Sequence, residues 1–431
     1  MVINIAAGLQ TYRKVLSDRR AVAFSVAGFV ARLPLSMTGL GIVLLVSLTT
    51  GSYGLAGLLT AAATVTAAVV APLWGRATDR VGQARVLLLT VMINVVSVAT
   101  LVSAIELGWP LPVNFAAAAG IGVGFSLAGS AVRARWTRQL DGSPLLHTAF
   151  AIEAMLDEVV FIIGPVVVTF LATALHPALG ITVSAAVGLV GAVALAAQRS
   201  TQPPIHSTSE GHHRSIRLPW QVLLPVAIAC SALGMIFGGM EVNVVAFAKE
   251  SGVLSYAGLI LIAWSFGSLV AGAVTGAITW RASPARRFRV SATLLALSLL
   301  PLPFIAHPLG VAMVLLLSGM AIAPTLIASV GVTQSAVEQT RLTEALAWTS
   351  TGLAAGVAGG AAVVGQVIDS WGAQAGFVAV AIAGLLLTLS AIFVRGPQRK
   401  VDSDLDHAGA SSEPTDSSAA QSSHPPVGTR S

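Results

Sequence analysis

Four charged residues lie deep inside long apolar runs of this chain. Arg32 stands about eleven residues into the first run, and Asp157 and Glu158 stand about ten residues into the fifth. If each run is a helix that crosses a bilayer, its rise of about 1.5 Å per residue places these three side chains roughly 15 Å deep. Glu153 lies one turn shallower than Asp157 and on the same helix face. A charge at such a depth is costly unless it is paired or functional.

These charges predict an ion-pair cluster that can also hold a proton. The matching depths indicate an ion pair between Arg32 and either Asp157 or Glu158. One arginine cannot neutralise three carboxylates, so we expect at least one carboxyl group to be protonated at neutral pH or to lie in a wet cavity, because desolvation and like charge both disfavour its ionised form. Our hypothesis is that Asp157 or Glu158 carries a coupling proton while the other holds Arg32. The alternative is a purely structural cluster that fixes the first run against the fifth.

The elements that position these charges are predicted to be membrane-spanning helices. Of the 431 residues, 55% are apolar and only 10% are charged, whereas soluble domains carry about 25% charged residues. A run of about 20 apolar residues is long enough to cross a bilayer. We therefore expect an all-α membrane protein with twelve spans. The spans lie roughly at 21–48, 54–74, 86–106, 111–132, 147–173, 178–198, 219–246, 254–279, 288–306, 309–335, 343–367 and 374–394.

The basic residues predict which ends of these spans face the cytoplasm. All but two of the 24 Lys and Arg residues fall at the chain ends or in every second connection, the exceptions being Arg32 and Lys249. Because cytoplasmic loops of membrane proteins are enriched in Lys and Arg, this alternation predicts that both termini are cytoplasmic. A miscounted span would disturb the alternation in everything that follows it.

The spans are predicted to form two bundles of six helices. Residues 21–198 and 219–394 contain six runs each, and glycines around the second run of each half recur at a shift of 201 residues. Such an internal repeat indicates two halves related by an axis along the membrane normal. The polar stretch 199–218 is expected to be a cytoplasmic linker. Residues 1–20 are expected to form an amphipathic segment on the cytoplasmic surface, and 395–431 to form a disordered cytoplasmic tail.

A short basic segment between the second and third runs carries a recognisable spacing. It reads Gly75-x-x-x-Asp79-Arg80-x-Gly82-x-x-Arg85, which resembles the loop 2–3 signature of the major facilitator superfamily. The resemblance covers 21–394 as topology and is specific at this loop. It implies alternating access, in which two bundles rock about a midplane site lined by spans 1, 4, 7 and 10.

The same resemblance implies that Asp79 holds a cytoplasmic gate shut. Its expected partners are the N-terminus of span 11 near Thr343–Ala345, where the helix dipole favours an anion, and arginines at the end of span 4. Arg133, Arg135 and Arg138 are available there.

Gly164-Pro165 in the fifth span resembles the core of the motif that marks the drug:proton antiporter branch of this superfamily. The glycines that follow it in that branch are absent, and Ala116 or Ala117 occupies the place of the branch's span-4 arginine. The resemblance favours efflux and leaves proton coupling without that arginine.

Other candidate residues are uncharged. Met37, Ser126, Asn243 and Thr325 lie on spans 1, 4, 7 and 10 and are candidates for lining a central cavity. No cofactor or metal is expected, because a single cysteine, Cys230, excludes a cysteine-built metal site. No nucleophile–base pair is evident, so the sequence does not predict an enzyme.

The sequence therefore predicts a multi-pass secondary transporter in a bacterial-type inner (plasma) membrane, which exports small organic molecules in exchange for protons. We expect a monomer whose partners are its substrate, protons and the lipid bilayer; the positive charge is spread over loops and predicts no nucleic-acid site. One alternative is an uptake permease of the same fold, a symporter or facilitator for a sugar or other metabolite. A second alternative is a membrane sensor or scaffold that does not transport.

Overall fold

The part of the chain that the structure describes is helical throughout, apart from short turns. The computed structural model describes residues 13–125, 127–141, 143, 145–204, 220–277, 282–337 and 342–394, and contains no β-strand among them. The helices of the first half are α2 (Arg19–Arg32), α3 (Pro34–Thr50), α4 (Tyr53–Val81), α5 (Gln83–Glu106), α6 (Leu111–Val123), α7 (Ala128–Gln139), α8 (Leu145–Ala174) and α9 (Leu179–Ala197). Those of the second half are α10 (Trp220–Glu250), α11 (Ala257–Ala277), α12 (Pro284–Leu299), α13 (Pro308–Ala336) and α14 (Leu342–Ile392).

These helices provide the twelve predicted membrane crossings. Eleven helical stretches of the described residues are long and apolar enough to cross a membrane, and the last of them contains two helices. They are divided at Gly372, whose φ of 78° lies in the left-handed region, where glycine is favoured because it has no Cβ. Two other crossings are broken: α2 and α3 meet at Leu33, and 124–127 separates α6 from α7.

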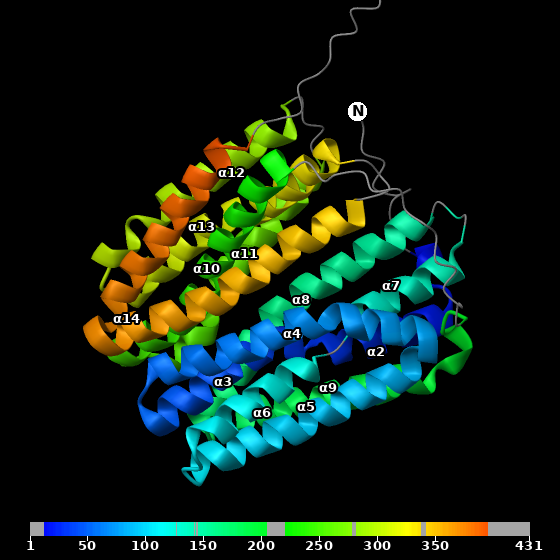
Figure 1. The fold of residues 1–431 in the computed structure, drawn as a ribbon, viewed down its shortest axis with the longest axis horizontal. Helices are drawn as coiled ribbons and strands as arrows, with labels where there is room; N and C mark the ends of the chain where they lie inside the picture. Colours follow the sequence, from blue (N-terminus) through cyan, green and yellow to red (C-terminus); the bar gives the residue numbers. More distant parts are fainter. Residues whose placement is uncertain are drawn as a thin grey trace, which may run out of the picture. The chain divides into compact units, whose positions relative to one another are not determined.

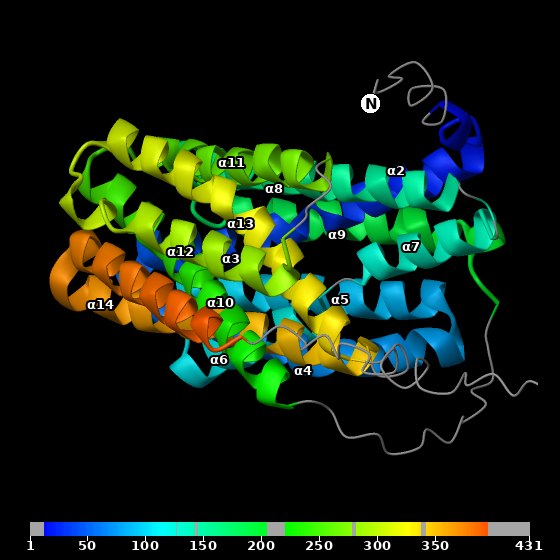
Figure 2. The same cartoon turned by 90° about the horizontal axis from the view of Figure 1, so that it is seen from above.

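The crossings form two bundles of six. Helices α2–α9 pack mainly against one another, as do α10–α14, and the two bundles meet along α4 and α14, α8 and α11, and α3 and α10. Figures 1 and 2 show α4 beside α14 in both views. The all-α membrane fold and its division into two six-helix bundles are confirmed.

Each bundle has turns at two opposite ends. We call them the Gly51 end and the Gly82 end, after the glycine in the first turn along the chain at each end. The Gly51 end holds the turns at 51–52, 107–110, 175–178, 251–256 and 300–307, and the break at Gly372. The Gly82 end holds the turn at Gly82 and the connection between α7 and α8. At the Gly51 end, Gln374 Nε2 donates to the Ile305 carbonyl at 3.2 Å, so neighbouring turns are tied together.

The turn at Gly82 is tighter than the sequence predicted. Helix α4 continues through Gly75 and Asp79 to Val81, so most of the predicted loop is helical. The α4 helix satisfies its backbone hydrogen bonds internally and can continue beyond the apolar run. Gly82 alone makes the turn: it is both the last cap of α4 and the first cap of α5, with φ 90° and ψ 151°. That conformation is essentially restricted to glycine.

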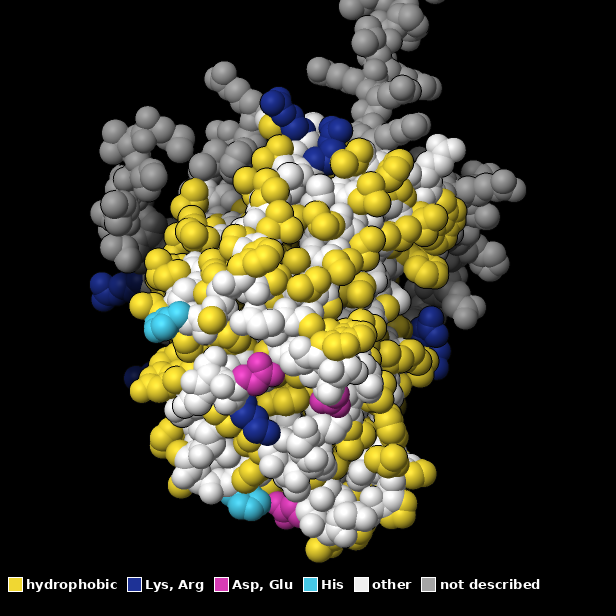
Figure 3. Space-filling model, turned by 90° about the vertical axis from the view of Figure 1, so that its left-hand side faces the viewer, with side chains coloured by type: hydrophobic (Ala, Val, Ile, Leu, Met, Phe, Trp, Pro, Cys, Tyr) yellow, Lys and Arg dark blue, Asp and Glu magenta, His cyan; other side chains and the backbone are white. Residues whose placement is uncertain are grey.

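The outer surface is rich in exposed apolar side chains. Val69, Phe170, Leu317 and Phe393 are each about 60% exposed or more. Figure 3 shows hydrophobic side chains over the upper part of the face in view, with acidic, basic and histidine side chains in its lower half and at its edges. A soluble protein rarely exposes so large an apolar surface. Contact with lipid accounts for it.

One face of α4 is packed at the Gly51 end and open at the Gly82 end. A Cβ atom on Gly57 would collide with the backbone oxygen of Ala361 in α14, whereas a Cβ atom on Gly75 would meet nothing within 4 Å. The two glycines are 18 residues apart, which is five turns of 3.6 residues, so they lie on the same face of the helix. The second half therefore packs against α4 at Gly57, whereas the face of α4 at Gly75 is open.

The chain segments outside the bundles are described only in part. Asp18 caps α2 by accepting from the backbone N–H of Arg20 at 2.8 Å, and Val15 is buried. Leu16, which lies within the predicted amphipathic segment, is exposed. The rest of the predicted N-terminal segment, 1–12, the linker beyond 204 and the tail 395–431 lie outside the described residues.

Gly57→Ala is expected to destabilise the packed end of α4 by about 1–3 kcal/mol, the usual cost of overpacking. Gly75→Ala is the matched control: it should be neutral or slightly stabilising, because alanine favours a helix by up to about 1 kcal/mol over glycine. Thermal unfolding of the purified protein in detergent measures both. Equal melting temperatures for the two variants would show that the halves are not in contact at Gly57.

Candidate functional site

Arg32 and Glu153 form a fully buried ion pair between the first and fifth crossings. Arg32 is the last residue of α2, and its Nη2 lies 2.5 Å from Glu153 Oε2 on α8. Glu153 also accepts from Ser25 Oγ at 2.5 Å and from Trp136 Nε1 at 2.8 Å. Because both Glu153 oxygens are hydrogen-bonded and the side chain is 0% exposed, Glu153 is a fixed counterion of Arg32.

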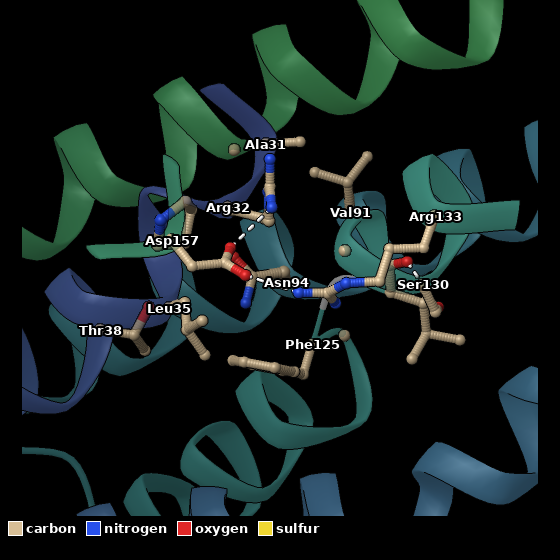
Figure 4. A pocket seen from close by; sticks show the side chains of 15 residues that line it. Ala31, Arg32, Leu35, Thr38, Val91, Asn94, Phe125, Ser130, Arg133 and Asp157 are labelled. Atoms are coloured by element: carbon tan, nitrogen blue, oxygen red, sulfur yellow. Dashed lines mark hydrogen bonds and ion pairs between the residues drawn. The ribbon is translucent and has the colours of Figure 1, made fainter. Parts of the chain in front are cut away.

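Asp157 lies one turn along α8 and is held differently. Its Oδ1 accepts from Arg32 Nη1 at 2.6 Å, and its Oδ2 accepts from Arg133 Nη2 on α7 at 2.6 Å. The Asp157 side chain is 26% exposed and that of Arg133 is 45% exposed, against 4% for Arg32. Figure 4 shows the carboxylate of Asp157 between the two guanidinium groups. Asp157 is thus the accessible carboxylate of the cluster.

The sequence left open whether Asp157 or Glu158 pairs with Arg32. In the structure the partners are Asp157 and Glu153, and Glu158 is in none of the ion pairs formed among the described residues. Helix phase explains this. Glu153 and Asp157 are four residues apart and share a face, while Glu158 is turned about 100° away from Asp157. Glu158 is only partly exposed, on the same helix.

The cluster borders a cavity of about 230 Å³ within the first bundle. Both broken crossings of this bundle reach it, because residues beside the Leu33 break and residues of 124–127 line its wall. Discontinuous helices commonly form substrate sites in transporters, since their free ends can bind ions and polar groups. The cavity is lined by Ala31, Arg32, Pro34, Leu35, Thr38, Val91, Asn94, Gly124, Phe125, Leu127, Gly129, Ser130, Arg133, Asp157 and Gly188.

The residues of the basic signature segment lie at the Gly82 end, away from the cluster. Asp79, Arg80 and Arg85 are exposed, and Gly75 faces open space. No ion pair among the described residues includes Asp79. The expected contact of Asp79 with the start of α14 involves residues 343 and 344, whose side chains lie outside those that the structure describes, so this contact stays a prediction.

The three arginines of α7 are bonded elsewhere in this structure. Arg133 binds Asp157, and the exposed Arg138 donates to the Gln202 carbonyl. Arg135 is buried; its Nε donates to Gln83 Oε1 at 3.0 Å, and its Nη1 to the Gln198 carbonyl at 3.1 Å. Arg135 therefore joins the ends of three crossings.

The uncharged cavity candidates lie elsewhere than in this cavity. Met37, Asn243 and Thr325 are 2% exposed or less, and Ser126 lies outside the described residues. Asn243 packs beside Gly376, and neither its oxygen nor its nitrogen has a hydrogen-bond partner in the described structure. Met37, Asn243 and Thr325 lie on the spans to which the sequence assigned them, and their lining of a central cavity stays a prediction.

The Gly51 end is closed by a carboxylate that sequence reasoning missed. Asp369 on α14 accepts hydrogen bonds from Ser52 Oγ, from the backbone N–H of Tyr53 and from that of Gly54, each at 2.7 Å. An acidic side chain at a helix N-terminus is favoured by the helix dipole and satisfies unpaired N–H groups. Asp369 thus holds the second bundle to the first residues of α4.

Several other partners were also missed. Ser25, Trp136 and Arg133 join the cluster through side chains on α2 and α7, and no spacing in the sequence relates them to Glu153 or Asp157. A signal existed only for Asp369, an acidic residue at the end of the eleventh predicted span that needs a partner near the membrane surface.

Comparison with known proteins agrees with this geometry. The family model described as Major Facilitator Superfamily matches residues 24–342. The structure of the nucleoside transporter NupG is similar at a TM-score of 0.67 with 15% identity, over 88% of this chain and 99% of that chain. An auto-inhibited POT family peptide transporter is similar at a TM-score of 0.64 with 11% identity, over 88% and 97% of the two chains. A bacterial homolog to the human lysosomal transporter Spinster, inward-facing and occupied, gives 0.65 with 12% identity, over 89% and 96%. No curated protein matches the chain.

Arg32→Met is expected to destabilise the protein by about 3–5 kcal/mol, because it leaves the buried carboxylate of Glu153 without its charged partner. The double variant Arg32→Met with Glu153→Met should recover much of that loss, since it removes the unpaired charge as well. Melting temperatures of the purified proteins test this. A double variant that is less stable than Arg32→Met would contradict the assignment of Glu153 as a structural counterion.

Proposed function

The chain belongs to the major facilitator superfamily, and we propose that it is a proton-coupled secondary transporter of small organic molecules that works by alternating access. Asp157 is the observation that carries the proposal: it is a partly exposed carboxylate, shared by Arg32 and Arg133, on the wall of a membrane-embedded cavity. Ionisable groups inside a membrane commonly mark proton or substrate pathways. Glu153 is fully hydrogen-bonded and buried, so we assign the coupling proton to Asp157 and leave Glu158 outside the site.

The bundles of residues 21–198 and 219–394 are proposed to move as two bodies. The Gly51 end is closed by Asp369, and the Gly82 end is open at Gly75. Basic residues gather at the Gly82 end, which supports its assignment, with both termini, to the cytoplasm. In the opposite state Asp79 would meet the start of α14 and an arginine of α7.

The direction of transport rests on two different observations. The Gly164-Pro165 pair favours efflux by proton antiport. In the structure, however, a Cβ atom on Gly164 would collide with Ser36 Oγ, so packing of α8 against α3 is enough to require this glycine. Uptake by symport is the second candidate, and it is favoured by Asp157, because protonation would free two arginines for a substrate. A non-transporting sensor is disfavoured by the exposed signature segment, which has no use in a protein that does not move.

The setting proposed for this activity is a bacterial-type inner (plasma) membrane. The protein would act there as a monomer without a cofactor, with a small molecule, protons and lipid as its partners.

Asp157→Asn is expected to abolish substrate-driven proton movement in everted membrane vesicles, while Glu158→Gln keeps it. The reason is that Asp157 alone shares its carboxylate between two arginines on the cavity wall. A pH-sensitive dye records the signal as small organic molecules are added; proton movement against the substrate indicates antiport, and movement with it indicates symport. Loss of the signal in Glu158→Gln alone would move the coupling proton to Glu158. Substrate flux without any proton signal in the wild type would indicate a facilitator.

A disulfide between Ser52→Cys and Asp369→Cys is expected to stop transport by locking the Gly51 end. The side chains at these positions are in contact, and Cys230 is the single native cysteine and is buried. Transport should fall on oxidation and return on reduction, in a Cys230→Ser background. The two single-cysteine variants are the controls and should not respond to oxidation. Full transport with the disulfide formed would show that this end need not open.

A further inference from the structure

We propose that the cavity beside Asp157 binds a small organic anion, which takes the place of the Asp157 carboxylate between Arg32 and Arg133 when Asp157 is protonated. This inference rests on the proposed proton-coupled transport and names its substrate class. The sequence showed one arginine at this depth and did not indicate the charge of the substrate. The structure adds Arg133, whose guanidinium reaches back from α7 to the cavity wall.

The charges of the cluster leave room for one exchangeable anion. Glu153 balances Arg32 permanently, because it is buried and bonded to Ser25, Trp136 and Arg32. Arg133 is then balanced by Asp157 alone among the described ion pairs. When Asp157 takes up a proton, the cavity retains one uncompensated positive charge. A ligand carboxylate restores neutrality and can accept charge-assisted hydrogen bonds from both guanidinium groups.

The groups that face Asp157 come from few helices. Arg32 on α2 and Arg133 on α7 contact it, and Glu153 and Glu158 are its acidic neighbours on α8. The other helices packed against α8 are α3, α9, α11 and the short 3₁₀ helix η2 (Leu254–Tyr256). They contain no carboxylate, Lys, Arg or His within their bounds, and the phenol of Tyr256 is their one titratable group. The protonation of Asp157 and the presence of an anion are therefore the two changes that can balance this cavity.

The first turn of α7 also favours an anion. Leu127, Gly129 and Ser130 lie at the start of α7 and line the cavity. The partial positive charge at a helix N-terminus attracts anions. This contribution is independent of the two arginines and acts on the same cavity.

The rest of the wall indicates the body of the ligand. Leu35, Val91 and Phe125 are apolar, while Thr38 and Asn94 add two hydrogen-bonding side chains. The volume of about 230 Å³ is below the range of drug-sized pockets, about 300–1,000 Å³. The cavity fits a small acid with one anionic group and a short apolar or aromatic body.

The proton and the anion then bind cooperatively. The proton is added to the Asp157 carboxylate, the ion pair between Asp157 and Arg133 is broken, and an ion pair between the anion and Arg133 replaces it. One proton and one anion enter together, so the loaded cavity carries the same net charge as the empty one. No covalent bond changes. Cooperative binding of this kind favours movement of proton and anion in the same direction.

The test measures binding to the purified wild-type protein in lipid nanodiscs, by thermal protection and calorimetry. The probes are benzoate, cyclohexanecarboxylate and butyrate, each compared with its amide and with the amine of similar shape. We expect protection by at least one carboxylate, stronger at mildly acidic than at alkaline pH, and none by the matched amide or amine. Equal or better protection by the amides or amines, or protection by none of the carboxylates, would overturn the proposal.

Three variants test whether the carboxylates bind in this cavity. Arg133→Gln should weaken carboxylate binding by about tenfold or more, the loss expected for a charged hydrogen bond. Asp157→Asn should bind the carboxylate without pH dependence, because it mimics the protonated residue. Arg138→Gln, on the same helix but bonded to the Gln202 carbonyl outside the cavity, is the control and should match the wild type. Unchanged binding in Arg133→Gln would exclude this cavity as the anion site.

The results also distinguish failure of the anion site from failure of the proposed proton-coupled transport. Carboxylate binding that depends on Arg133, with no proton movement in vesicles, would keep the anion site and remove proton coupling. Proton movement driven by amines, without carboxylate binding, would keep proton-coupled transport and remove the anion site.

Discussion

The pairing of Arg32 with two carboxylates of α8 is the interaction on which the rest of the first bundle depends. An arginine in the middle of a membrane crossing is stable only when it is paired and hydrogen-bonded. Glu153 meets this need permanently, supported by Ser25 and Trp136. Because Glu153 already balances the charge of Arg32, the second carboxylate, Asp157, can bind a proton or be replaced by an anionic ligand.

The two bundles are likewise held together by a small number of specific contacts. They are held at the Gly51 end by one carboxylate on three donors of α4 and by glycines that allow backbones to touch. Hydrogen bonds and close backbone packing stabilise helix contacts in a membrane, where apolar side chains gain little by leaving lipid for protein. Such contacts are specific and few, so they can be broken and remade without exposing a large apolar core.

Much of the fold followed from the sequence because lipid imposes simple rules. Backbone groups cannot remain unpaired in a bilayer, so each apolar run had to be a helix. A charged side chain inside an apolar run costs free energy in the bilayer, so the basic residues lie near the ends of the runs. Twelve crossings in two sets of six were therefore predictable, and so was the membership of Arg32, Glu153 and Asp157 in a buried cluster. The resemblance of the Gly75–Arg85 segment pointed to the family in the same way.

The sequence by itself determined which residues lie at the same depth, because helix rise converts position into depth. Only the tertiary structure decided which of them face one another, since that depends on the rotation and tilt of each helix against its neighbours. Glu153 rather than Glu158 became the partner of Arg32 through a rotation of half a turn or less. Arg133 lies on the cavity wall and pairs with Asp157, and Met37, Asn243 and Thr325 are buried. Contacts between bundles, such as that of Asp369 with Ser52, join residues hundreds of positions apart, and no local pattern encodes them.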